Sequence, residues 1–183
     1  MQSAPYDARA ICNVMLDMAE EHRAPLSNLA LQKLLYFVYA RHLIDTKQPL
    51  VTGYFEAWQY GPVHPAAYKA FKAAGEALIS FRATRRDPLT GQQSELEIPN
   101  DPAVEKLIRW VIVSYGHLTP GRLVEVSHAK GAPWDFVVNK ARTKMALGLR
   151  ISDTVIIERF KFHKISVGAE PTTGEPVEDA PFA

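Results

Sequence analysis

The residues that could perform acid–base or nucleophilic chemistry do not form a recognisable catalytic pattern. His128 could act as a general base together with Asp135 or Glu125, as in a hydrolase. No serine or cysteine lies in a nucleophile elbow, however, and Cys12 falls on the flank of a predicted helix. We therefore predict no catalytic residue, and a His128-dependent hydrolase is the weakest alternative.

The histidines also lack the spacing of a metal site. They are spread over the whole chain, at His22, His42, His64, His117, His128 and His163. No two of them are four residues apart, as a zinc site on one helix requires, and a single cysteine cannot provide a zinc-binding cluster. We predict neither a metal site nor another cofactor.

A short aromatic segment indicates binding more strongly than any residue indicates catalysis. Residues 54–63 read Tyr-Phe-Glu-Ala-Trp-Gln-Tyr-Gly-Pro-Val, with four aromatic rings before a Gly-Pro pair. The alternation of residue types along Phe55–Tyr60 predicts a short strand, and we expect Gly61 and Pro62 to turn the backbone out of it toward a new helix. Large rings held at a fixed bend are suited to recognition.

The overall composition fits one globular domain. The chain has 183 residues, of which 47% are hydrophobic and 22% charged, which is enough to bury a core. Residues 1–10 show no apolar signal segment, and the lone Cys12 cannot close an internal disulfide. The most apolar runs, Leu29–Ala40 and Trp110–Tyr115, are shorter than the roughly 20 residues of a membrane span. We therefore expect a cytoplasmic protein without a membrane helix.

The C-terminal residues differ in composition from the rest of the chain. Residues 166–183 contain four carboxylates and neither lysine nor arginine, so the net charge of +1 becomes +5 without them. The same stretch is rich in proline and glycine and has almost nothing to bury. We predict a folded domain over residues 1–167 and a disordered acidic tail over residues 168–183.

Most of the elements that must position these side chains are predicted to be helices. Apolar residues recur at helical spacing in several stretches, and Ser, Thr or Asp caps, two of them followed by proline, mark where helices begin. The six or seven predicted helices cover residues 8–20, 28–44, 64–74, 102–115, 120–128, 134–141 and 152–162.

One stretch instead shows the alternation of a β-hairpin. Apolar and polar residues alternate along Leu78–Ile98, and the Asp-Pro-Leu-Thr-Gly sequence at residues 87–91 supplies a turn. The aromatic strand is a candidate partner for this hairpin. The predicted fold class is therefore mainly α (α+β), a compact single domain with a small antiparallel β-sheet.

Three blocks of sequence resemble one known family. They are Leu-Gln-Lys-Leu-Leu-Tyr-Phe at residues 31–37, Glu-Ala-Trp-Gln-Tyr-Gly-Pro-Val at residues 56–63, and Val-Ser-His at residues 126–128 followed by Pro-Trp at residues 133–134. In order and spacing they resemble the Panacea domain, also called the SocA-like antitoxin domain, over about residues 8–163. Ser127 stands where many members have threonine, which keeps the hydroxyl group.

The resemblance implies a non-enzymatic protein of a toxin–antitoxin system. Panacea proteins resemble antitoxins that bind and neutralise a cognate protein toxin. SocA-like members are further understood as proteolytic adaptors that deliver the toxin to a AAA+ protease of the ClpXP type. The family's mostly helical fold with a small sheet agrees with the elements predicted from the sequence pattern.

The candidate residues for partner binding are aromatic residues, their neighbours and the third block, namely Tyr54, Trp58, Tyr60, Pro62, Val63, His128 and Trp134. Trp and Tyr suit binding because each combines a large apolar area with a hydrogen-bonding tip. Such rings are also common in protein cores, and by about two to one this is the stronger interpretation for Trp58. We expect His128 to interact as an imidazolium with the carbonyls that end a short helix, and Trp134 to pack beneath it.

A DNA-binding autoregulator is the second alternative. Positive charge gathers late in the chain, at Lys140, Arg142, Lys144, Arg150, Arg159, Lys161 and Lys164. No helix-turn-helix pattern accompanies these residues, and charged residues on helices usually form a solvated face. We therefore expect that the chain binds no nucleic acid alone and that any DNA role requires a partner or a further domain.

Overall fold

The computed structural model describes residues 3–143, 149–161, 176 and 178–182. Within them the chain forms the helices α1 (Ala8–Glu21), α2 (Asn28–Thr46), α3 (Pro65–Phe71), α4 (Pro102–Tyr115), α5 (Pro120–Ser127), α6 (Pro133–Thr143) and α7 (Asp153–Arg159). A 3₁₀ turn, η1 (Lys72–Ala74), follows α3. The short strands are β1 (Phe55–Trp58), β2 (Gly61–Val63), β3 (Thr84–Arg86), β4 (Gln93–Glu95) and β5 (Arg150–Ile151). The predicted fold class, a mainly helical α+β domain with small antiparallel sheets, is confirmed.

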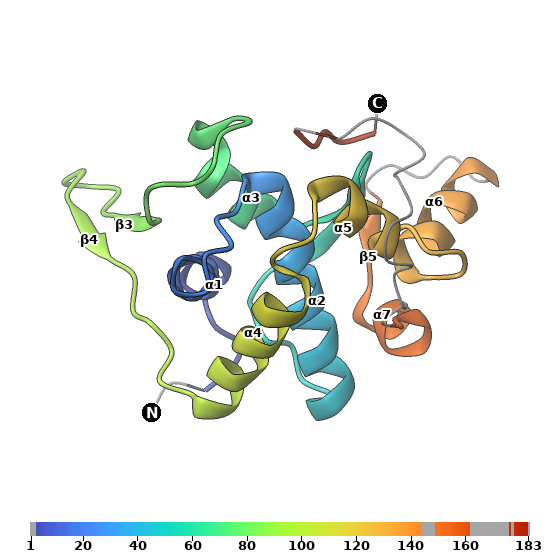
Figure 1. The fold of residues 1–183 in the computed structure, drawn as a ribbon, viewed down its shortest axis with the longest axis horizontal. Helices are drawn as coiled ribbons and strands as arrows, with labels where there is room; N and C mark the ends of the chain where they lie inside the picture. Colours follow the sequence, from blue (N-terminus) through green and yellow to red (C-terminus); the bar gives the residue numbers. More distant parts are fainter. Residues whose placement is uncertain (1–2, 144–148, 162–175, 177, 183) are drawn as a thin grey trace.

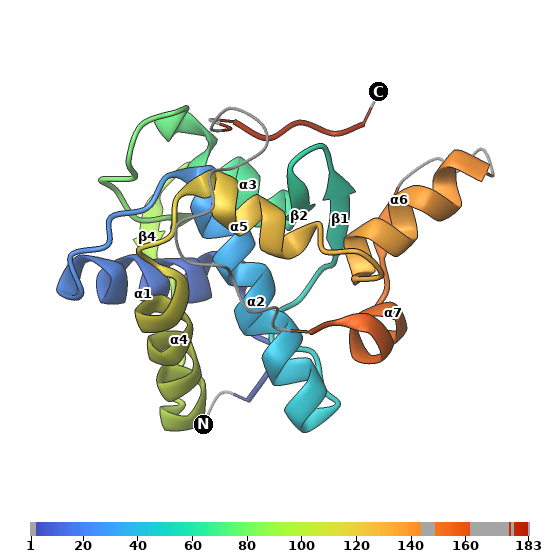
Figure 2. The same cartoon turned by 45° about the vertical axis from the view of Figure 1, so that its right-hand side comes forward.

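Helix α2 forms the centre of the molecule. Figures 1 and 2 show it passing between α1 and α4 on one side and the β1–β2 pair and α7 on the other, and it packs against all of these elements; its contact with β1 is made by the Tyr36 and Tyr39 rings against Phe55. Its sequence explains this position, because Leu31, Leu34 and Leu35 are 0% exposed and apolar residues cover nearly every side of the helix. Burying each of these leucines stabilises the fold by roughly 1.5–3 kcal/mol.

The helix starts follow the capping pattern predicted from the sequence. The Asp101 carboxylate accepts hydrogen bonds from the Ala103 and Val104 backbone N–H groups at the start of α4. Thr119 and Ser152 cap α5 and α7 in the same way. These contacts satisfy backbone donors that a helix start otherwise leaves unpaired. None of the described helices combines the length and apolarity needed to cross a bilayer.

The aromatic segment forms a hairpin of its own. β1 lies between β2 and β5 in an antiparallel sheet, with Trp58 opposite Gly61 and Ala57 opposite Pro62. The prediction that Gly61 and Pro62 turn the chain out of the strand is wrong, because the turn is Gln59–Tyr60 and these two residues begin the returning strand. β2 is an edge strand, where proline is tolerated, and Gly61 has the positive φ of +115° that follows the tight turn.

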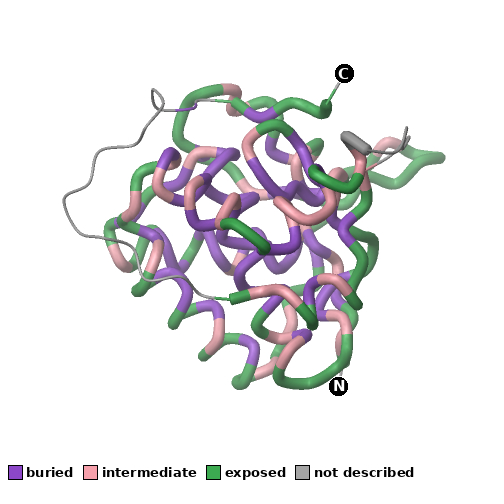
Figure 3. The backbone as a smooth tube through the Cα atoms, turned by 90° about the vertical axis from the view of Figure 1, so that its right-hand side faces the viewer, coloured by how far each residue is buried: buried purple, intermediate pink, exposed green. Residues whose placement is uncertain are grey.

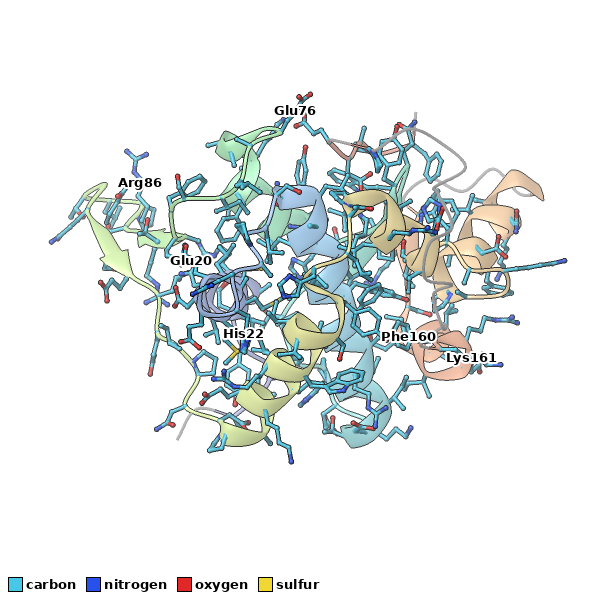
Figure 4. All side chains as sticks on the ribbon, in the orientation of Figure 1. Glu20, His22, Glu76, Arg86, Phe160 and Lys161 are labelled. Atoms are coloured by element: carbon cyan, nitrogen blue, oxygen red, sulfur yellow. The ribbon has the colours of Figure 1, made fainter. Side chains whose placement is uncertain are left out.

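The second predicted hairpin, β3–β4, is confirmed, but the aromatic strand does not pair with it. β1 already has a partner on each edge, so β3 and β4 form a separate two-stranded sheet at the opposite end of the molecule (Figure 1). Figure 4 shows Arg86 of β3 at this outer end, whereas Phe160 lies beyond α2, where its ring packs against Tyr36.

The C-terminal segment, residues 178–182, lies against the body of the protein within a stretch whose composition predicts a solvated tail. The predicted domain end at residue 167 and residues 168–175 and 177 lie outside the described residues. Residues 178–182, however, pass over the β1–β2 turn and α3, close to the body of the protein (Figures 1 and 2). Figure 3 shows a buried portion between exposed ones in this segment, and Asp179 is 4% exposed. Asp179 is buried because it forms an ion pair with Lys33, a contact that the composition of the segment does not indicate.

Candidate functional site

The centre of the candidate site is a buried ion pair between α2 and the C-terminal segment. The Lys33 Nζ atom lies 2.6 Å from the Asp179 Oδ2 atom, and both side chains are 0% exposed. Lys33 also donates a hydrogen bond to the Pro62 carbonyl oxygen, at 3.2 Å. Lysine and aspartate are almost never fully buried unless they are paired, so this contact accounts for the burial of both.

The surroundings of Lys33 make the carboxylate important to it. Burial lowers the pKa of Lys33 below its ordinary value, and the charge and hydrogen bond of Asp179 oppose that shift. Burying an ammonium group without a partner costs several kcal/mol. The pocket around Lys33 therefore favours a ligand that brings a negative charge.

The second carboxylate oxygen of Asp179 is bound by backbone groups. Asp179 Oδ1 accepts hydrogen bonds from the N–H groups of Tyr60 and Ala180, each at 2.9 Å. The Ala180 carbonyl oxygen in turn accepts from the Gln59 N–H at 2.8 Å. The β1–β2 turn thus binds both a side chain and the backbone of the C-terminal segment.

Two further side chains hold the ends of this segment. The Tyr68 hydroxyl group on α3 donates to Glu178 Oε1 at 3.1 Å and lies 3.4 Å from the Asp179 carbonyl oxygen. At the other end, the ring centroids of Trp134 and Phe182 are 6.1 Å apart. Residues 178–182 are therefore held by α2, the β1–β2 turn, α3 and α6 together.

Gly61 lies against Ser127 and Lys33, where no larger side chain fits. A Cβ atom at this position would lie 2.5 Å from Ser127 Oγ and 3.0 Å from Lys33 Cε. Ser127 itself is fixed by donating its hydroxyl proton to the Val124 carbonyl oxygen at 2.8 Å. Glycine is required twice over, for its positive φ and for the close approach of Lys33 and Ser127.

The His128 and Trp134 rings stack on each other beside the Lys33–Asp179 pair. Their centroids are 3.5 Å apart and their planes 12° from parallel, and the Trp134 indole N–H donates to the Trp58 carbonyl oxygen at 2.7 Å. Burial, reinforced by the Lys33 charge, lowers the pKa of His128 to about 4. The expected packing of Trp134 against His128 is confirmed, but the expected imidazolium is wrong, because a desolvated histidine beside an ammonium group is neutral at pH 7.

Trp58 lies within the fold more than on its surface. It is 8% exposed, its ring meets Tyr68 edge to face at 4.8 Å, and its indole N–H donates to Glu56 Oε2 at 2.7 Å. The core interpretation of this residue is the one the burial favours. Its carbonyl oxygen still contributes to the site through Trp134.

The structure brings five of the seven candidate residues together. Those around the Lys33–Asp179 pair are Trp58, Tyr60, Pro62, His128 and Trp134. Val63 is 0% exposed and belongs to the core. Tyr54 lies before β1, away from the β1–β2 turn, is 42% exposed, and has the Arg150 guanidinium 4.8 Å from its ring centroid.

Gln32, which precedes Lys33 in the first sequence block, is a second buried polar residue in the apolar helix α2. It is 0% exposed, its Oε1 atom accepts from the His64 N–H at 3.1 Å, and its amide group donates to Asn28 Oδ1 at 3.1 Å. Gln32 therefore binds the backbone just after β2, as Lys33 binds the backbone within it. Two adjacent polar residues fix the hairpin against α2.

Sequence reasoning did not single out Lys33 or Asp179. Lys33 was visible only as a charge inside an otherwise apolar run, and Asp179 as one of four carboxylates near the C-terminus. A lysine on a helix with no polar face is the signal that could have indicated a buried partner. Nothing local indicates which carboxylate it is.

The residues considered for hydrolysis have other partners. Asp135 accepts from the Gly131 N–H at 2.9 Å and from the Asn139 amide at 3.0 Å. Glu125 pairs with Arg122 at 2.9 Å. Cys12 is buried, and burial raises the pKa of its thiol, which disfavours the reactive thiolate. In the part of the chain that the structure describes, no group of three or more His, Cys, Asp or Glu residues could hold a metal ion.

Comparison with known proteins gives two consistent matches. The family described as "Antitoxin SocA-like, Panacea domain" matches residues 31–135, which contain all three sequence blocks. The chain is also 47% identical over 175 residues to Antitoxin SocA of Caulobacter vibrioides (strain NA1000 / CB15N), covering 96% of this chain and 93% of that relative. No solved structure matches the chain significantly.

Proposed function

Because this chain belongs to the SocA-like antitoxin family with the Panacea domain, we propose that it is a non-enzymatic antitoxin that binds and neutralises a cognate protein toxin. The observation that carries the proposal is the 47% identity, over nearly the full length of both chains, to a protein named an antitoxin. At this identity the core and the surface around it are expected to be shared.

The arrangement of the three sequence blocks supports a binding role. The first block supplies Lys33, the second supplies the β1–β2 turn, and the third supplies Ser127 and His128, all around one site. That site holds an extended piece of polypeptide, residues 178–182, by side-chain and backbone contacts. A surface that already binds one peptide segment is suited to recognising a protein.

The energy required is within reach of a domain of this size. Nanomolar toxin binding corresponds to about 12 kcal/mol, usually from roughly 1,600 Å² of buried surface with a few aromatic or arginine anchors. Partly exposed rings that could contribute to such an interface are Tyr54 at 42% and Trp110 at 43% exposure. The toxin interface is therefore expected to extend beyond the site around Lys33.

The test of the antitoxin proposal is co-expression with the neighbouring reading frame. We expect that frame to arrest growth alone, that this chain restores growth, and that the two proteins co-purify. A neighbour that is harmless, or an arrest that this chain does not relieve, would contradict the proposal. A chain carrying Leu89→Asp, a change at a residue that is 95% exposed on the β3–β4 turn, is the matched control and should still restore growth.

The adaptor role is a second part of the proposal. As the family resemblance implies, we propose that the bound toxin is handed to a AAA+ protease of the ClpXP type. Purified toxin should then be degraded by ClpXP only when this chain is present, measured as loss of the toxin band over time. Equal toxin stability with and without the chain would restrict the function to neutralisation by binding.

A further inference from the structure

We propose that the pocket at Lys33 is a recognition site for an extended acidic segment of the protein partner, and that residues 178–182 of this chain occupy it until that partner binds. The proposal rests on the antitoxin function, since the partner meant is the toxin. It assigns the site a ligand chemistry, an aspartate side chain in extended polypeptide. It also assigns the C-terminal segment the role of an internal competitor.

The contacts of the segment are those of peptide recognition. The Asp179 side chain is completely buried against Lys33, and the backbone carbonyl of Ala180 accepts a hydrogen bond from the Gln59 N–H in the β1–β2 turn. Domains that bind extended peptides commonly use this combination, in which backbone hydrogen bonds give affinity and a side-chain pocket gives specificity. The segment itself forms neither helix nor strand, as expected of such a ligand.

The pocket belongs to the body of the domain and not to the segment. Lys33 comes from α2, the Pro62 carbonyl from β2, and Ser127 from the end of α5. When the segment leaves, the Lys33 ammonium group keeps the Pro62 carbonyl as an acceptor but loses its neutralising charge. An ammonium group has three donors and a strong need for a counter-charge when buried, so the emptied pocket selects a carboxylate.

Only one side chain of the segment is buried, which makes exchange feasible, because its other contacts lie at the surface. Asp179 is 4% exposed, whereas its neighbours Glu178 and Ala180 are exposed and Phe182 is 40% exposed. A partner segment with one aspartate and a free backbone carbonyl can reproduce the central contacts. Because a tethered occupant competes at an effective concentration on the order of millimolar, the partner must also bind surface outside the pocket.

The test uses the full-length chain and a labelled synthetic peptide with the sequence of residues 176–183, Pro-Val-Glu-Asp-Ala-Pro-Phe-Ala. Asp179→Asn in the full chain weakens the internal occupant while keeping its shape. We expect this variant to bind the peptide, measured by fluorescence anisotropy, at least about tenfold more tightly than the wild-type chain does. A peptide with Asn in place of its Asp should lose that gain. Lys33→Met, which removes the charge from the pocket, should abolish it in the full chain.

Toxin binding supplies the second arm. If the toxin uses the pocket, the Asp179→Asn chain should bind toxin with an apparent Kd about tenfold lower than wild type, and the peptide should compete. If the toxin binds the Asp179→Asn and wild-type chains with equal affinity and the peptide does not compete, the proposal is overturned and residues 178–182 have only a structural role. Failure of the chain to bind toxin at all would contradict the antitoxin function instead, so the two failures are distinguishable.

A second variant covers the case in which Asp179→Asn does not fold. A specific protease site inserted between residues 170 and 171 allows the wild-type segment to be cut after the protein has folded. We expect the cut C-terminal piece to be released on dilution and the remaining body to bind the labelled peptide. Retention of the piece through gel filtration, with no exchange for peptide, would contradict the role of a displaceable occupant.

Discussion

The β3–β4 hairpin and the site around Lys33 show two different ways of holding a turn in this protein. In the hairpin, the Asp87 carboxylate accepts from the backbone N–H groups of Leu89 and Thr90, two and three residues away, and every strand residue is exposed. At the site, the β1–β2 turn is bound by Asp179, 119 residues from Tyr60, and the Lys33–Asp179 pair is completely buried.

The two kinds of contact predict different effects of substitutions on stability. Contacts in the hairpin are local and share their donors and acceptors with water, so each contributes little to stability. Contacts at the site are made between distant segments in a place that water does not reach, so a missing partner leaves an uncompensated charge or clash. The expected loss of stability therefore decreases from the site to the hairpin.

The largest effect should come from removing the carboxylate at the site. Asp179→Ala leaves the Lys33 ammonium group buried and unpaired, and we expect a loss of about 3–5 kcal/mol in the free energy of unfolding. Urea denaturation followed by circular dichroism measures it. Asp45→Ala, which breaks the half-exposed Arg41–Asp45 pair, is the matched control and should cost less than about 1 kcal/mol. Equal losses in the two variants would show that the buried pair stabilises the fold no more than the half-exposed pair does.

Acidification should reveal the neutral histidine at the site. Because the folded-state pKa of His128 is about 4 and its unfolded pKa is near 6.5, the unfolded chain binds this proton first as the pH falls. Its contribution to stability is therefore full above pH 6.5 and declines toward pH 4, by about 3 kcal/mol.

The corresponding measurement is the free energy of unfolding at several pH values between 7 and 4. His128→Gln should show a shallower decline than wild type over this range, whereas the matched variant His117→Gln, at an exposed histidine, should follow wild type. Parallel curves for all three proteins would contradict the assignment of a neutral, buried imidazole.

Two glycines allow a direct comparison of the regions. Gly61 and Gly91 both have positive φ, +115° and +70°. An added Cβ would meet Ser127 Oγ at 2.5 Å at the first position but only the Arg86 side chain at 3.6 Å at the second. We expect Gly61→Ala to cost about 3 kcal/mol and Gly91→Ala about 1 kcal/mol, as measured by thermal unfolding. A cost at Gly91 equal to that at Gly61 would show that backbone strain, and not the close approach of Ser127, dominates.

The smallest effect should be at the tip of the hairpin. Leu89 is 95% exposed on the turn, so Leu89→Asp should change the free energy of unfolding by no more than about 0.5 kcal/mol. Toxin binding by this variant, followed in the same pull-down as wild type, should also be unchanged. A marked loss of toxin binding would instead place the hairpin in the partner interface.

The features predicted correctly from the sequence are those that depend on neighbouring residues. The turn at residues 87–91 was recognisable because Asp87, Pro88 and Gly91 each have a known local effect on the backbone. The cap at Asp101 was recognisable for the same reason, since its carboxylate binds N–H groups two and three residues later. Such signals act within one turn of chain and need no knowledge of the fold.

Apart from the turn, which lies at Gln59–Tyr60 and not at Gly61–Pro62, the wrong predictions involve a choice among distant partners. The periodicity of the aromatic segment predicted a strand but not its neighbours, and the structure places β2 and β5 beside it in preference to the β3–β4 hairpin. His128 was expected to be charged because its helix end was visible, whereas the Lys33 charge and the burial that make it neutral come from elsewhere.

The amino-acid sequence alone was enough to predict the helices, the β3–β4 hairpin, an aromatic strand, the family and the set of side chains suited to binding. The pairing of Lys33 with Asp179, 146 residues away, and the binding of the C-terminal segment by the β1–β2 turn became visible only in the folded structure. The physical reason is that backbone preferences and helical periodicity act over a few residues, whereas burial and charge pairing depend on which surfaces meet when the chain folds.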